Sequence, residues 1–262
     1  MSRHVHELFD LSGQNALITG GSRGLGLQVA EALGEVGATV VLTSRKKTDL
    51  EKSVELLRDR GIDAHWVAGD AADTDEIVRI CDNAADAVGS ISILVNNAGA
   101  TWGAPAEDYP LSAWDKVMNL NVRSVFLFSQ YIAKHHMIPA RFGRILMMAS
   151  GAGLSGGTPG QETVAYNTSK AAVINLTRAL AGEWGEFGIT VNALAPGLFP
   201  SKMTRGTIDF LGTENLTQRI PLRRLGDDED LKGASVLLSS AAGKHITGQV
   251  LPVDGGLFAV NG

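Results

Sequence analysis

Short runs of apolar residues alternate with longer segments of helical periodicity from one end of the chain to the other. The runs at 93–95 and 145–148 contain only aliphatic residues and methionine. Such continuous runs are typical of parallel strands that are covered on both faces, and parallel strands are joined by right-handed helical crossovers. The pattern therefore predicts an α/β protein built on a three-layer, doubly wound parallel sheet of about seven strands.

The expected elements follow one another without a linker, an internal repeat or a low-complexity tract. The expected strands are residues 15–19, 39–43, 64–68, 91–96, 144–149, 190–194 and 249–253. The helices expected between the first six strands are residues 24–36, 47–60, 73–88, 112–136 and 163–187. We therefore expect residues 1–262 to form a single domain.

Two segments in the last third of the chain stand apart from this alternation. Residues 196–225 have no clear period and contain scattered glycine and proline, which is typical of a lid over a binding site. The acidic run at 227–230 is expected to begin a further helix, because carboxylates are favoured at a helix N-terminus. A calcium site is the remote alternative.

The composition excludes several classes of protein. The chain has 262 residues, 44% of them hydrophobic and 19% charged, which is an ordinary balance for a protein with one large core. Its net charge of −5 gives no attraction to nucleic acids or anionic membranes. The sequence shows neither a signal peptide nor an apolar run of roughly 18 residues, and Cys81 has no cysteine to pair with. We therefore expect a cytoplasmic protein without a nucleic-acid or membrane partner. The histidines are too scattered to predict a metal site.

A glycine-rich turn follows the first expected strand. Residues 19–26 read Thr-Gly-Gly-Ser-Arg-Gly-Leu-Gly and run directly into a helical pattern. Glycine allows a tight strand-to-helix turn and lets the backbone approach a pyrophosphate at the helix N-terminus. The spacing of Gly20, Gly24 and Gly26 differs from the common G-x-G-x-x-G fingerprint. A turn without any ligand is the alternative interpretation.

The end of the second expected strand lacks an acidic residue. A site for NAD(H) would place a carboxylate there to hold the ribose hydroxyls, whereas this chain has Ser44 and Arg45. Arg45, together with Arg23 of the glycine turn, is suited to bind a 2′-phosphate, so NADP(H) is favoured over NAD(H). The alternative is that the cations of 45–47 simply begin a solvated helix.

Tyr166 and Lys170 lie four residues apart in a helical pattern, which places them on one helix face. A tyrosine hydroxyl titrates near 10 in its ordinary state, so a nearby ammonium favours the phenolate and lets the tyrosine transfer a proton at neutral pH. Taken alone, such a pair is an ordinary exposed helix pair.

These motifs occur together with several others in a fixed order. Residues 19–26, the Asn-Asn-Ala-Gly of 96–99, Asn121, Ser150, the Tyr166/Lys170 pair and the Pro-Gly of 196–197 follow one another along the chain. In this order they resemble the short-chain dehydrogenase/reductase family. The resemblance extends from about residue 11 to the Val-Asp-Gly-Gly of 253–256. It implies a Rossmann fold, a nicotinamide cofactor and the transfer of a hydride between that cofactor and a carbonyl or alcohol.

The resemblance also implies catalytic roles. Tyr166 would be the general acid in reduction and the base in the reverse direction. Lys170 would lower the pKa of Tyr166 and bind the nicotinamide ribose, and Ser150 would hold the substrate oxygen. Asn121 would anchor a water that links Lys170 to solvent. Asn119 is a competing candidate for this role by residue type, but residues 124–126 that follow align Asn121 with the family position.

For the cofactor, the resemblance implies that Asp70 contacts the adenine, that 97–99 pack along the adenosine half and that 196–198 flank the nicotinamide. The residues expected to bind the cofactor are Gly20, Ser22, Arg23, Gly24, Leu25, Gly26, Ser44, Arg45, Asp70, Ala71, Asn97, Ala98, Gly99, Tyr166, Lys170, Pro196, Gly197, Phe199 and Ser201. Two departures from the family pattern concern the substrate side of the site. The loop 151–165 is longer than usual, and Phe199 and Ser201 stand where an aliphatic residue and threonine are usual.

Within the family, residues 94–103 and 195–205 resemble 3-oxoacyl reductases, especially the type of rhamnolipid biosynthesis. The expected function is therefore reduction of a 3-oxoacyl thioester, with an acyl carrier protein or coenzyme A as the possible carrier. The residues expected to line an apolar acyl pocket are Trp102, Leu154, Phe199 and Met203. The alternative is that these four residues only pack the lid and the core.

Two other functions remain as alternatives. The last third of the chain also resembles gluconate 5-dehydrogenases, whose substrate is a polar sugar acid. Lys202 or Arg205 would pair with its carboxylate or attract an acidic carrier protein. A catalytically silent NADP(H)-binding sensor is a third possibility, but the complete set of Asn121, Ser150, Tyr166 and Lys170 argues against it.

The expected helices at 112–136 and 163–187 resemble those through which family members form dimers and tetramers. Their apolar residues, which include Phe126, Phe128, Ile174 and Leu180, exceed what one sheet face needs. A homotetramer is therefore expected.

Overall fold

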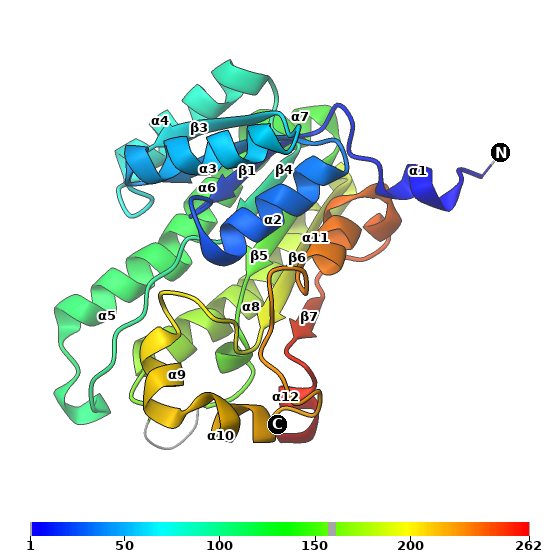
Figure 1. The fold of residues 1–262 in the computed structure, drawn as a ribbon. Coiled ribbons are helices and arrows are strands. Elements are labelled where there is room, and N and C mark those ends of the chain that lie inside the picture. Colours follow the sequence, from blue (N-terminus) through cyan, green and yellow to red (C-terminus); the bar gives the residue numbers. More distant parts are fainter. Residues whose placement is uncertain (1, 157–160, 262) are drawn as a thin grey trace.

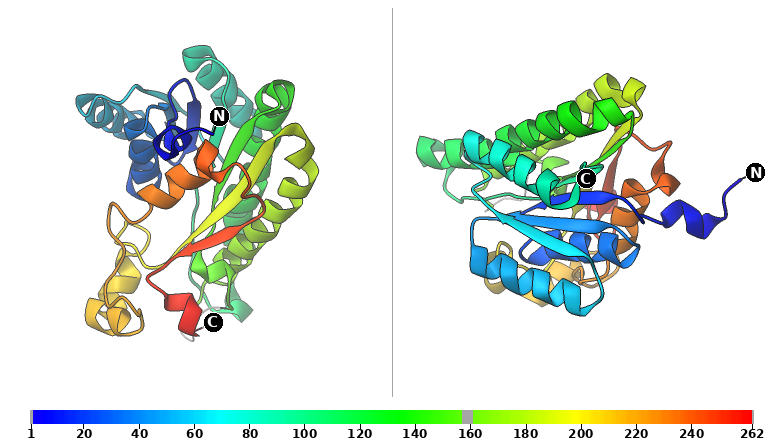
Figure 2. Two further views of the ribbon diagram at one scale, coloured as in Figure 1. Left: turned by 90° about the vertical axis from the view of Figure 1, so that its right-hand side faces the viewer. Right: turned by 90° about the horizontal axis from the view of Figure 1, so that it is seen from above.

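The computed structural model describes residues 2–156 and 161–261. Its centre is a parallel sheet of seven strands in the order β3-β2-β1-β4-β5-β6-β7. Figures 1 and 2 show this twisted sheet between two layers of helices. The strands are β1 (Asn15–Thr19), β2 (Thr39–Ser44), β3 (Ala64–Ala68), β4 (Ile93–Asn96), β5 (Gly143–Met148), β6 (Ile189–Pro196) and β7 (Val250–Val253). The predicted three-layer α/β fold with a parallel sheet is confirmed. Strand boundaries shift by up to two residues, chiefly at β4 and β6.

The helices between the strands also agree with the periodicity. The longer ones are α2 (Gly24–Glu35), α3 (Lys47–Asp59), α4 (Thr74–Val88), α5 (Leu111–Met118), α6 (Ser124–Ile132), α8 (Val164–Trp184) and α11 (Lys232–Ser239). The helix expected at 112–136 is α5 and α6 joined and extended by two π-helical segments, Asn119–Arg123 and Ala133–Met137. It ends in the short α7 (Ile138–Ala140). A π-helical turn inside an α-helix is often found at a functional site.

Each sheet face has its own core because successive side chains of a strand point to opposite faces. In β1, Leu17 packs in the cluster that includes α4, α6 and α8, whereas Ile18 packs in the cluster that includes α2, α3 and α11. Both residues are fully buried. The continuous apolar strands of the sequence therefore fill two cores at once, as a doubly covered sheet requires.

The apolar surplus expected on the long helices is smaller than predicted. Phe128, Ile174 and Leu180 are buried in the core of the single chain, where they pack against the sheet and against neighbouring helices. Phe126 is exposed to 38%. Three of the four residues offered as surplus are therefore needed by the chain itself, and they give no support to a homotetramer.

The segment 196–225 contains two short helices that the sequence did not reveal, α9 (Arg205–Leu211) and α10 (Thr213–Gln218). Figure 1 shows them at the same end of the molecule as α12 (Leu257–Asn261), the last helix. The remaining helix, α1 (Val5–Phe9), precedes the sheet. No helix within the described residues is long and apolar enough to cross a membrane.

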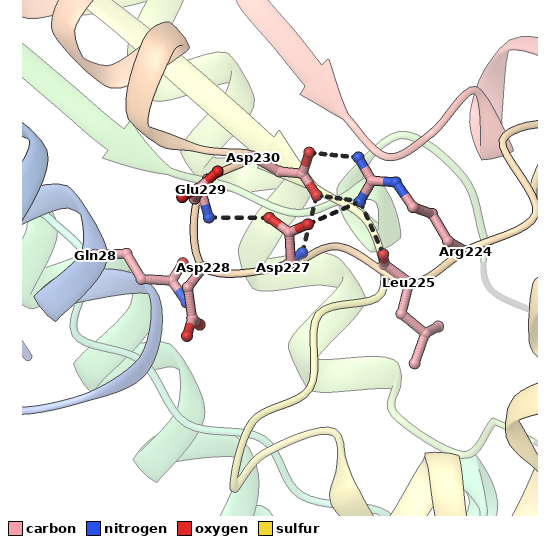
Figure 3. Close-up of polar contacts among 7 residues, drawn as sticks. All are labelled: Gln28, Arg224, Leu225, Asp227, Asp228, Glu229 and Asp230. Atoms are coloured by element: carbon pink, nitrogen blue, oxygen red, sulfur yellow. Dashed lines mark hydrogen bonds and ion pairs between the residues drawn. The ribbon is translucent and has the colours of Figure 1, made fainter.

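The expectation that 227–230 begin a helix is wrong. α11 begins later, at Lys232, because the acidic side chains have other partners (Figure 3). The Arg224 guanidinium donates to both oxygens of Asp230, at 2.5 and 2.7 Å, and lowers the pKa of Asp230 to about 2. Asp228 Oδ1 accepts a hydrogen bond of 2.7 Å from Gln28 Nε2. The acidic run therefore forms a turn that ties the end of the lid segment to α2.

Candidate active site

The candidate residues lie where the carboxyl ends of β1, β4, β5 and β6 meet at one edge of the sheet. Gly20 follows β1, Asn97 follows β4, Ser150 lies two residues beyond β5 and Gly197 follows β6. In open parallel α/β sheets, ligands bind at this edge. The fold thus brings together residues that are far apart in the sequence.

The glycine turn has the geometry of a phosphate site. Gly20 and Gly24 have positive φ angles of +65° and +53°, which glycine adopts without strain. A Cβ on Gly20 would lie 2.9 Å from Asn97 Nδ2, whereas a Cβ on Gly24 would meet no atom of the described residues within 4 Å. No side chain in this part of the structure caps the N-terminus of α2 at Arg23. The turn is therefore closely packed on one side and open on the other, with free helix N–H groups that suit an anion.

Thr19 joins the glycine turn to the segment after β4. Its Oγ1 accepts hydrogen bonds of 3.0 Å from the backbone N–H groups of Asn97 and Ala98. In return, Asn97 Nδ2 donates to the carbonyls of Thr19 at 2.9 Å and Gly20 at 3.1 Å. The predicted cofactor residues 97–99 therefore lie against the turn. Thr19 belonged to the recognised motif, but its own role is visible only once both strands are in place.

The end of β2 carries polar groups without partners. The Ser44 hydroxyl oxygen is buried and makes no hydrogen bond with the described residues. Arg45 is exposed and makes no ion pair with any of the described residues. Arg23, by contrast, lies 3.7 Å from the Asp49 carboxylate. A buried hydroxyl without a partner is costly, so the Ser44 and Arg45 pair fits an anionic ligand group such as a 2′-phosphate.

The adenine-side residues predicted after β3 form a tight turn. Asp70 is partly buried, and its Oδ1 accepts a hydrogen bond of 3.0 Å from the backbone N–H of Ala72. Ala71 lies between them in the chain and packs against the core cluster that includes α4, α6 and α8. This turn lies at the carboxyl end of β3, next to that of β2. It therefore borders the same edge as Ser44.

Lys170 is buried behind Tyr166 near the start of α8. Its side chain is 5% exposed, and its Nζ lies 5.6 Å from the centre of the Tyr166 ring. The Nζ donates a hydrogen bond of 2.7 Å to the Met148 carbonyl at the end of β5. Burial lowers the pKa of Lys170 to about 8. The i, i+4 pair predicted on one helix face is thus a buried arrangement and not an exposed helix pair.

Burial is the main influence on the pKa of the Tyr166 hydroxyl within the described residues. Burial raises it above its ordinary value, and a hydrogen bond to Ser150 only partly opposes this shift. Within the described residues, Tyr166 is therefore a neutral phenol at neutral pH.

Asn121 is the buried member of the two candidate asparagines. It lies in the π-helical segment between α5 and α6 and is 0% exposed, whereas Asn119 is exposed. Its Oδ1 accepts from the Ala100 N–H at 2.8 Å, and its Nδ2 donates to the Ala100 carbonyl at 2.9 Å. The Nδ2 also donates to Ser169 Oγ at 2.9 Å, and this hydroxyl donates to the Tyr166 carbonyl at 2.7 Å. Asn121 thus links the segment after β4 to the helix turn of Tyr166.

Gly99 separates Asn121 from Lys170. A Cβ at this position would lie 3.4 Å from Asn121 Oδ1 and 3.7 Å from Lys170 Nζ. The backbone of Gly99 therefore lies directly beside both polar side chains. Ser169, which completes this group, was missed from the sequence because a serine inside a helix carries no signal until its partner is known.

Ser150 ends the β5 segment in an extended conformation and caps a short 3-10 turn, Gly151–Gly153. Its Oγ accepts a hydrogen bond of 3.2 Å from the Ala152 N–H. Part of the longer loop that follows, residues 157–160, lies outside the described residues. The described part resumes at Gln161, and the Glu162 carbonyl accepts from the Ala104 N–H at 2.8 Å. The loop before α8 therefore runs beside the segment after β4.

Pro196 is the last residue of β6, and Gly197 follows it. The Gly197 N–H donates to the Val253 carbonyl at 3.0 Å, and Asp254 leaves no room for a Cβ on this glycine. The Ser201 hydroxyl is 3.0 Å from Thr204 Oγ1, which itself donates to the Phe199 carbonyl. Thr204 thus organises the start of the lid segment, a role that the sequence did not reveal.

The assignment of the Phe199 side chain to the apolar substrate pocket is wrong. Its side chain is 3% exposed and lies in the core cluster of α2, α3 and α11. Its ring packs so closely on Gly226 that a Cβ there would collide with it. A cavity of about 430 Å³ next to Phe199 is lined by the lid segment and the chain around β7, and not by Ser150, Tyr166 or Lys170. The backbones are also in contact here, since the Gly226 N–H donates to the neighbouring Leu198 carbonyl at 2.9 Å.

The other three predicted pocket residues are exposed at the sheet edge. Trp102, Leu154 and Met203 are 45%, 42% and 43% exposed. They follow the carboxyl ends of β4, β5 and β6, which are neighbours in the sheet. Lys116 Nζ lies 5.9 Å from the centre of the Trp102 ring. Three exposed apolar side chains thus follow adjacent strand ends, and a cation lies beside one of them.

Known proteins are similar to this chain in both sequence and fold. The family model described as enoyl-(acyl carrier protein) reductase matches residues 20–258. The gluconate 5-dehydrogenase of Gluconobacter oxydans is 40% identical over 252 residues, which cover 96% of this chain and 97% of that protein. The rhamnolipids biosynthesis 3-oxoacyl-[acyl-carrier-protein] reductase of Pseudomonas aeruginosa is 38% identical over 256 residues, with coverage of 96% and 99%.

A solved structure agrees over nearly the whole chain. The gluconate 5-dehydrogenase of Burkholderia cenocepacia in complex with NADP and tartrate superimposes with a TM-score of 0.91 at 34% identity. The match covers 98% of this chain and 100% of that one. Together with the family model and the relatives, this agreement shows that the chain belongs to the short-chain dehydrogenase/reductase family, as a nicotinamide-dependent oxidoreductase that acts on CH–OH donors.

Proposed function

We propose that this protein is an NADP(H)-dependent reductase of 3-oxoacyl thioesters in which Tyr166 supplies the proton. The observation that carries the reaction type is the buried arrangement of Lys170 behind Tyr166, with Ser150 hydrogen-bonded to the tyrosine and Asn121 two contacts away. A protein that only bound the cofactor would have no need for a buried ammonium beside a phenol.

The described residues fit NADP(H). The open side of the glycine turn at Gly24 and the free N–H groups of α2 suit the pyrophosphate. Ser44 and Arg45 would hold the 2′-phosphate, since the hydroxyl lacks a partner and no carboxylate occupies this position. Bound NADP in the Burkholderia cenocepacia relative supports this choice. When bound, the reduced nicotinamide supplies the hydride that the carbonyl carbon accepts.

Proton transfer is the part of the reaction that the chain performs. Ser150 holds the carbonyl oxygen of the substrate next to the Tyr166 hydroxyl. Because burial keeps Tyr166 protonated at neutral pH, it can donate its proton to that oxygen as the new C–H bond forms. The alcohol is then complete, and Tyr166 is left as a phenolate. The Lys170 ammonium stabilises the negative charge of the phenolate. Asn121 lies beside Gly99, as Lys170 does, and would anchor the water that links Lys170 to solvent.

The acyl substrate is supported by the mouth of the site. Large apolar side chains that remain exposed often mark a binding surface. Trp102, Leu154 and Met203 border the carboxyl ends of three adjacent strands. An acyl chain would cover these side chains, and its thioester carrier, an acyl carrier protein or coenzyme A, would remain outside. The 3-oxoacyl reductase of Pseudomonas aeruginosa is a relative with this substrate in its name.

A sugar acid is the second candidate, and a different observation favours it. Lys116 is exposed beside Trp102 at the same edge and offers a cation for a carboxylate. Lys202 and Arg205 are exposed at the start of the lid segment and could serve likewise. The relative from Gluconobacter oxydans is named for this activity.

A substrate panel separates the two candidates. Purified protein is mixed with NADPH and either a 3-oxoacyl-coenzyme A thioester or 5-keto-D-gluconate, and the loss of reduced cofactor is followed by absorbance. Each assay is repeated with NADH. The expected result is faster turnover of the thioester with NADPH. Faster turnover of the keto acid would assign the protein to sugar acids, and a preference for NADH would contradict the role of Arg45.

Two variants refine this test. Trp102→Ala should lower kcat/KM for the thioester while leaving the keto acid unaffected, because only the acyl chain needs the apolar surface. Val78→Ala removes a side chain of similar exposure, 40%, from α4 and serves as the control. Equal loss on both substrates would mean that Trp102 acts by holding the site together.

We also propose the homotetrameric assembly of many family members, with α6 and α8 in the interface. The half-exposed Phe126 of α6 is the residue that supports it. Sedimentation at micromolar concentration should give a single species of four chains, and a monomer would contradict the proposal.

A further inference from the structure

The last helix of the chain returns to the active site. After β7, the residues Asp254, Gly255 and Gly256 reverse the chain, with φ angles of +65° and +90° at the two glycines. Asp254 fixes this reversal, because its Oδ1 accepts from the Gly256 N–H and its Oδ2 from the Phe258 N–H, both at 2.8 Å. We call residues 254–258 the C-terminal turn. It determines where the Phe258 side chain lies.

Phe258 packs directly on the residue after Ser150. A Cβ built on Gly151 would collide with the Phe258 ring, so the ring lies against the Gly151 backbone. Gly151 is buried and begins the short 3-10 turn that also gives Ser150 Oγ its hydrogen bond from Ala152. We call residues 150–154 the Ser150 turn.

The opposite side of the Ser150 turn rests on α8. A Cβ on Gly153 would lie 2.6 Å from the carbonyl carbon of Lys170 and 2.8 Å from the Ala171 nitrogen. The turn is therefore held between the backbone of the Lys170 helix turn and the ring of Phe258. The two glycines are required because the turn is in contact on both sides.

The C-terminal turn is also attached to the end of the lid segment. The Leu222 N–H donates to the Gly255 carbonyl at 3.1 Å. A Cβ on Gly255 would lie 2.6 Å from Ile220, and one on Gly256 would lie 3.0 Å from Pro221. A continuous set of contacts thus runs from the lid through the C-terminal turn to the Ser150 turn.

We propose that Phe258 is a positioning residue for the reaction: its ring holds the Ser150 turn against α8 and so keeps the Ser150 hydroxyl next to Tyr166. This proposal rests on the proposed function of Ser150. Phe258 is partly exposed and belongs to neither core cluster of the described residues. Its removal should therefore affect the site more than the fold.

The contact predicts a specific pattern of variants. Phe258→Ala should lower kcat for the carbonyl substrate by roughly ten- to a hundredfold, because small displacements of a catalytic group have effects of this size. The affinity for NADPH and the thermal unfolding temperature should stay close to those of the wild type. Phe258→Leu should recover part of kcat. Val260→Ala, on the same helix and 67% exposed, should leave kcat unchanged.

A double-variant cycle tests whether the ring acts through Gly151. Gly151→Ala alone should lower kcat strongly, because the new methyl group and the ring cannot occupy the same space. In the Phe258→Ala background the methyl group has room, so the same change should cost much less. Equal effects of Gly151→Ala in both backgrounds, or wild-type kcat in Phe258→Ala, would overturn the proposal.

Hydrogen exchange gives a readout that does not depend on turnover. The Gly153 and Leu154 N–H groups donate within the Ser150 turn, to Ser150 and Gly151, at 2.9 Å each. Phe258→Ala should speed their exchange, and Val260→Ala should not. Faster exchange in a protein that turns over none of the panel substrates would support the contact between Phe258 and the Ser150 turn but contradict the proposed function. Unchanged exchange would contradict the proposal that the Phe258 ring holds the Ser150 turn in place.

Discussion

Lys170 Nζ donates a hydrogen bond of 2.7 Å to the Met148 carbonyl, which joins α8 to the end of β5. The ammonium is buried, and this burial lowers the pKa of Lys170 to about 8. The same side chain thus fixes the helix that carries Tyr166 and holds a charge that is lost close to neutral pH. Activity and the charge of Lys170 are therefore expected to be coupled.

The pH dependence of the reduction follows from this coupling. The folded-state pKa of Lys170 lies below its ordinary value, so the positive charge is complete well below pH 8 and is lost as the pH rises through about 8. Without the charge, the phenolate left on Tyr166 is less stable, so kcat should fall above about pH 8. A pH–rate profile with saturating NADPH measures this. A rate that stays constant well above pH 8 would show that Lys170 does not titrate in the working enzyme.

Removal of the Tyr166 hydroxyl should abolish turnover without loss of the cofactor. Tyr166→Phe keeps the ring that packs over Lys170 but removes the proton donor. We expect kcat to fall by roughly a hundredfold or more, with NADPH affinity close to that of the wild type in a fluorescence titration. Wild-type turnover of this variant would mean that another group supplies the proton.

Arg45 should determine the choice between the two cofactors. Arg45→Ala should weaken NADPH binding about tenfold, since a hydrogen bond to a charged group contributes roughly 1.5 kcal/mol or more. NADH binding should not change, because NADH has no 2′-phosphate. Lys46→Ala removes the same charge one residue further along and is the matched control. If both variants weaken NADPH equally, the effect comes from the overall positive charge and not from Arg45.

The sequence predicted the arrangement of the sheet because a parallel strand buried on both faces is apolar at every position, as 145–148 are. It could not predict that Phe199 is buried beneath the lid, because the direction of that ring depends on Gly226, which is distant in the sequence. The acidic run at 227–230 was wrongly assigned to a helix for a different reason. Its partner Arg224 was not recognised, and an ion pair in a turn leaves no periodic pattern.

Within the site, the sequence predicts which residues lie together where their spacing alone requires it. Tyr166 and Lys170 are an example, because only an interval of three or four residues places two side chains on the same helix face. Prediction failed where a contact is made by backbone atoms or by a residue of no special type. The Thr19 hydroxyl and the Phe258 ring act through such contacts, and the residues that they contact are far away in the sequence.

The two asparagines of the π-helical segment give a matched pair of variants. Asn121→Ala would leave the N–H and carbonyl of Ala100 without their partners at 2.8 and 2.9 Å. An unsatisfied buried polar group costs about 1 to 3 kcal/mol, so the free energy of unfolding in urea should fall by this amount, and kcat should fall with it. Asn119→Ala changes an exposed side chain of the same type in the same segment and should alter neither quantity. If Asn119→Ala lowered kcat and Asn121→Ala did not, the link from Ala100 through Ser169 to the Tyr166 turn would have no part in the reaction.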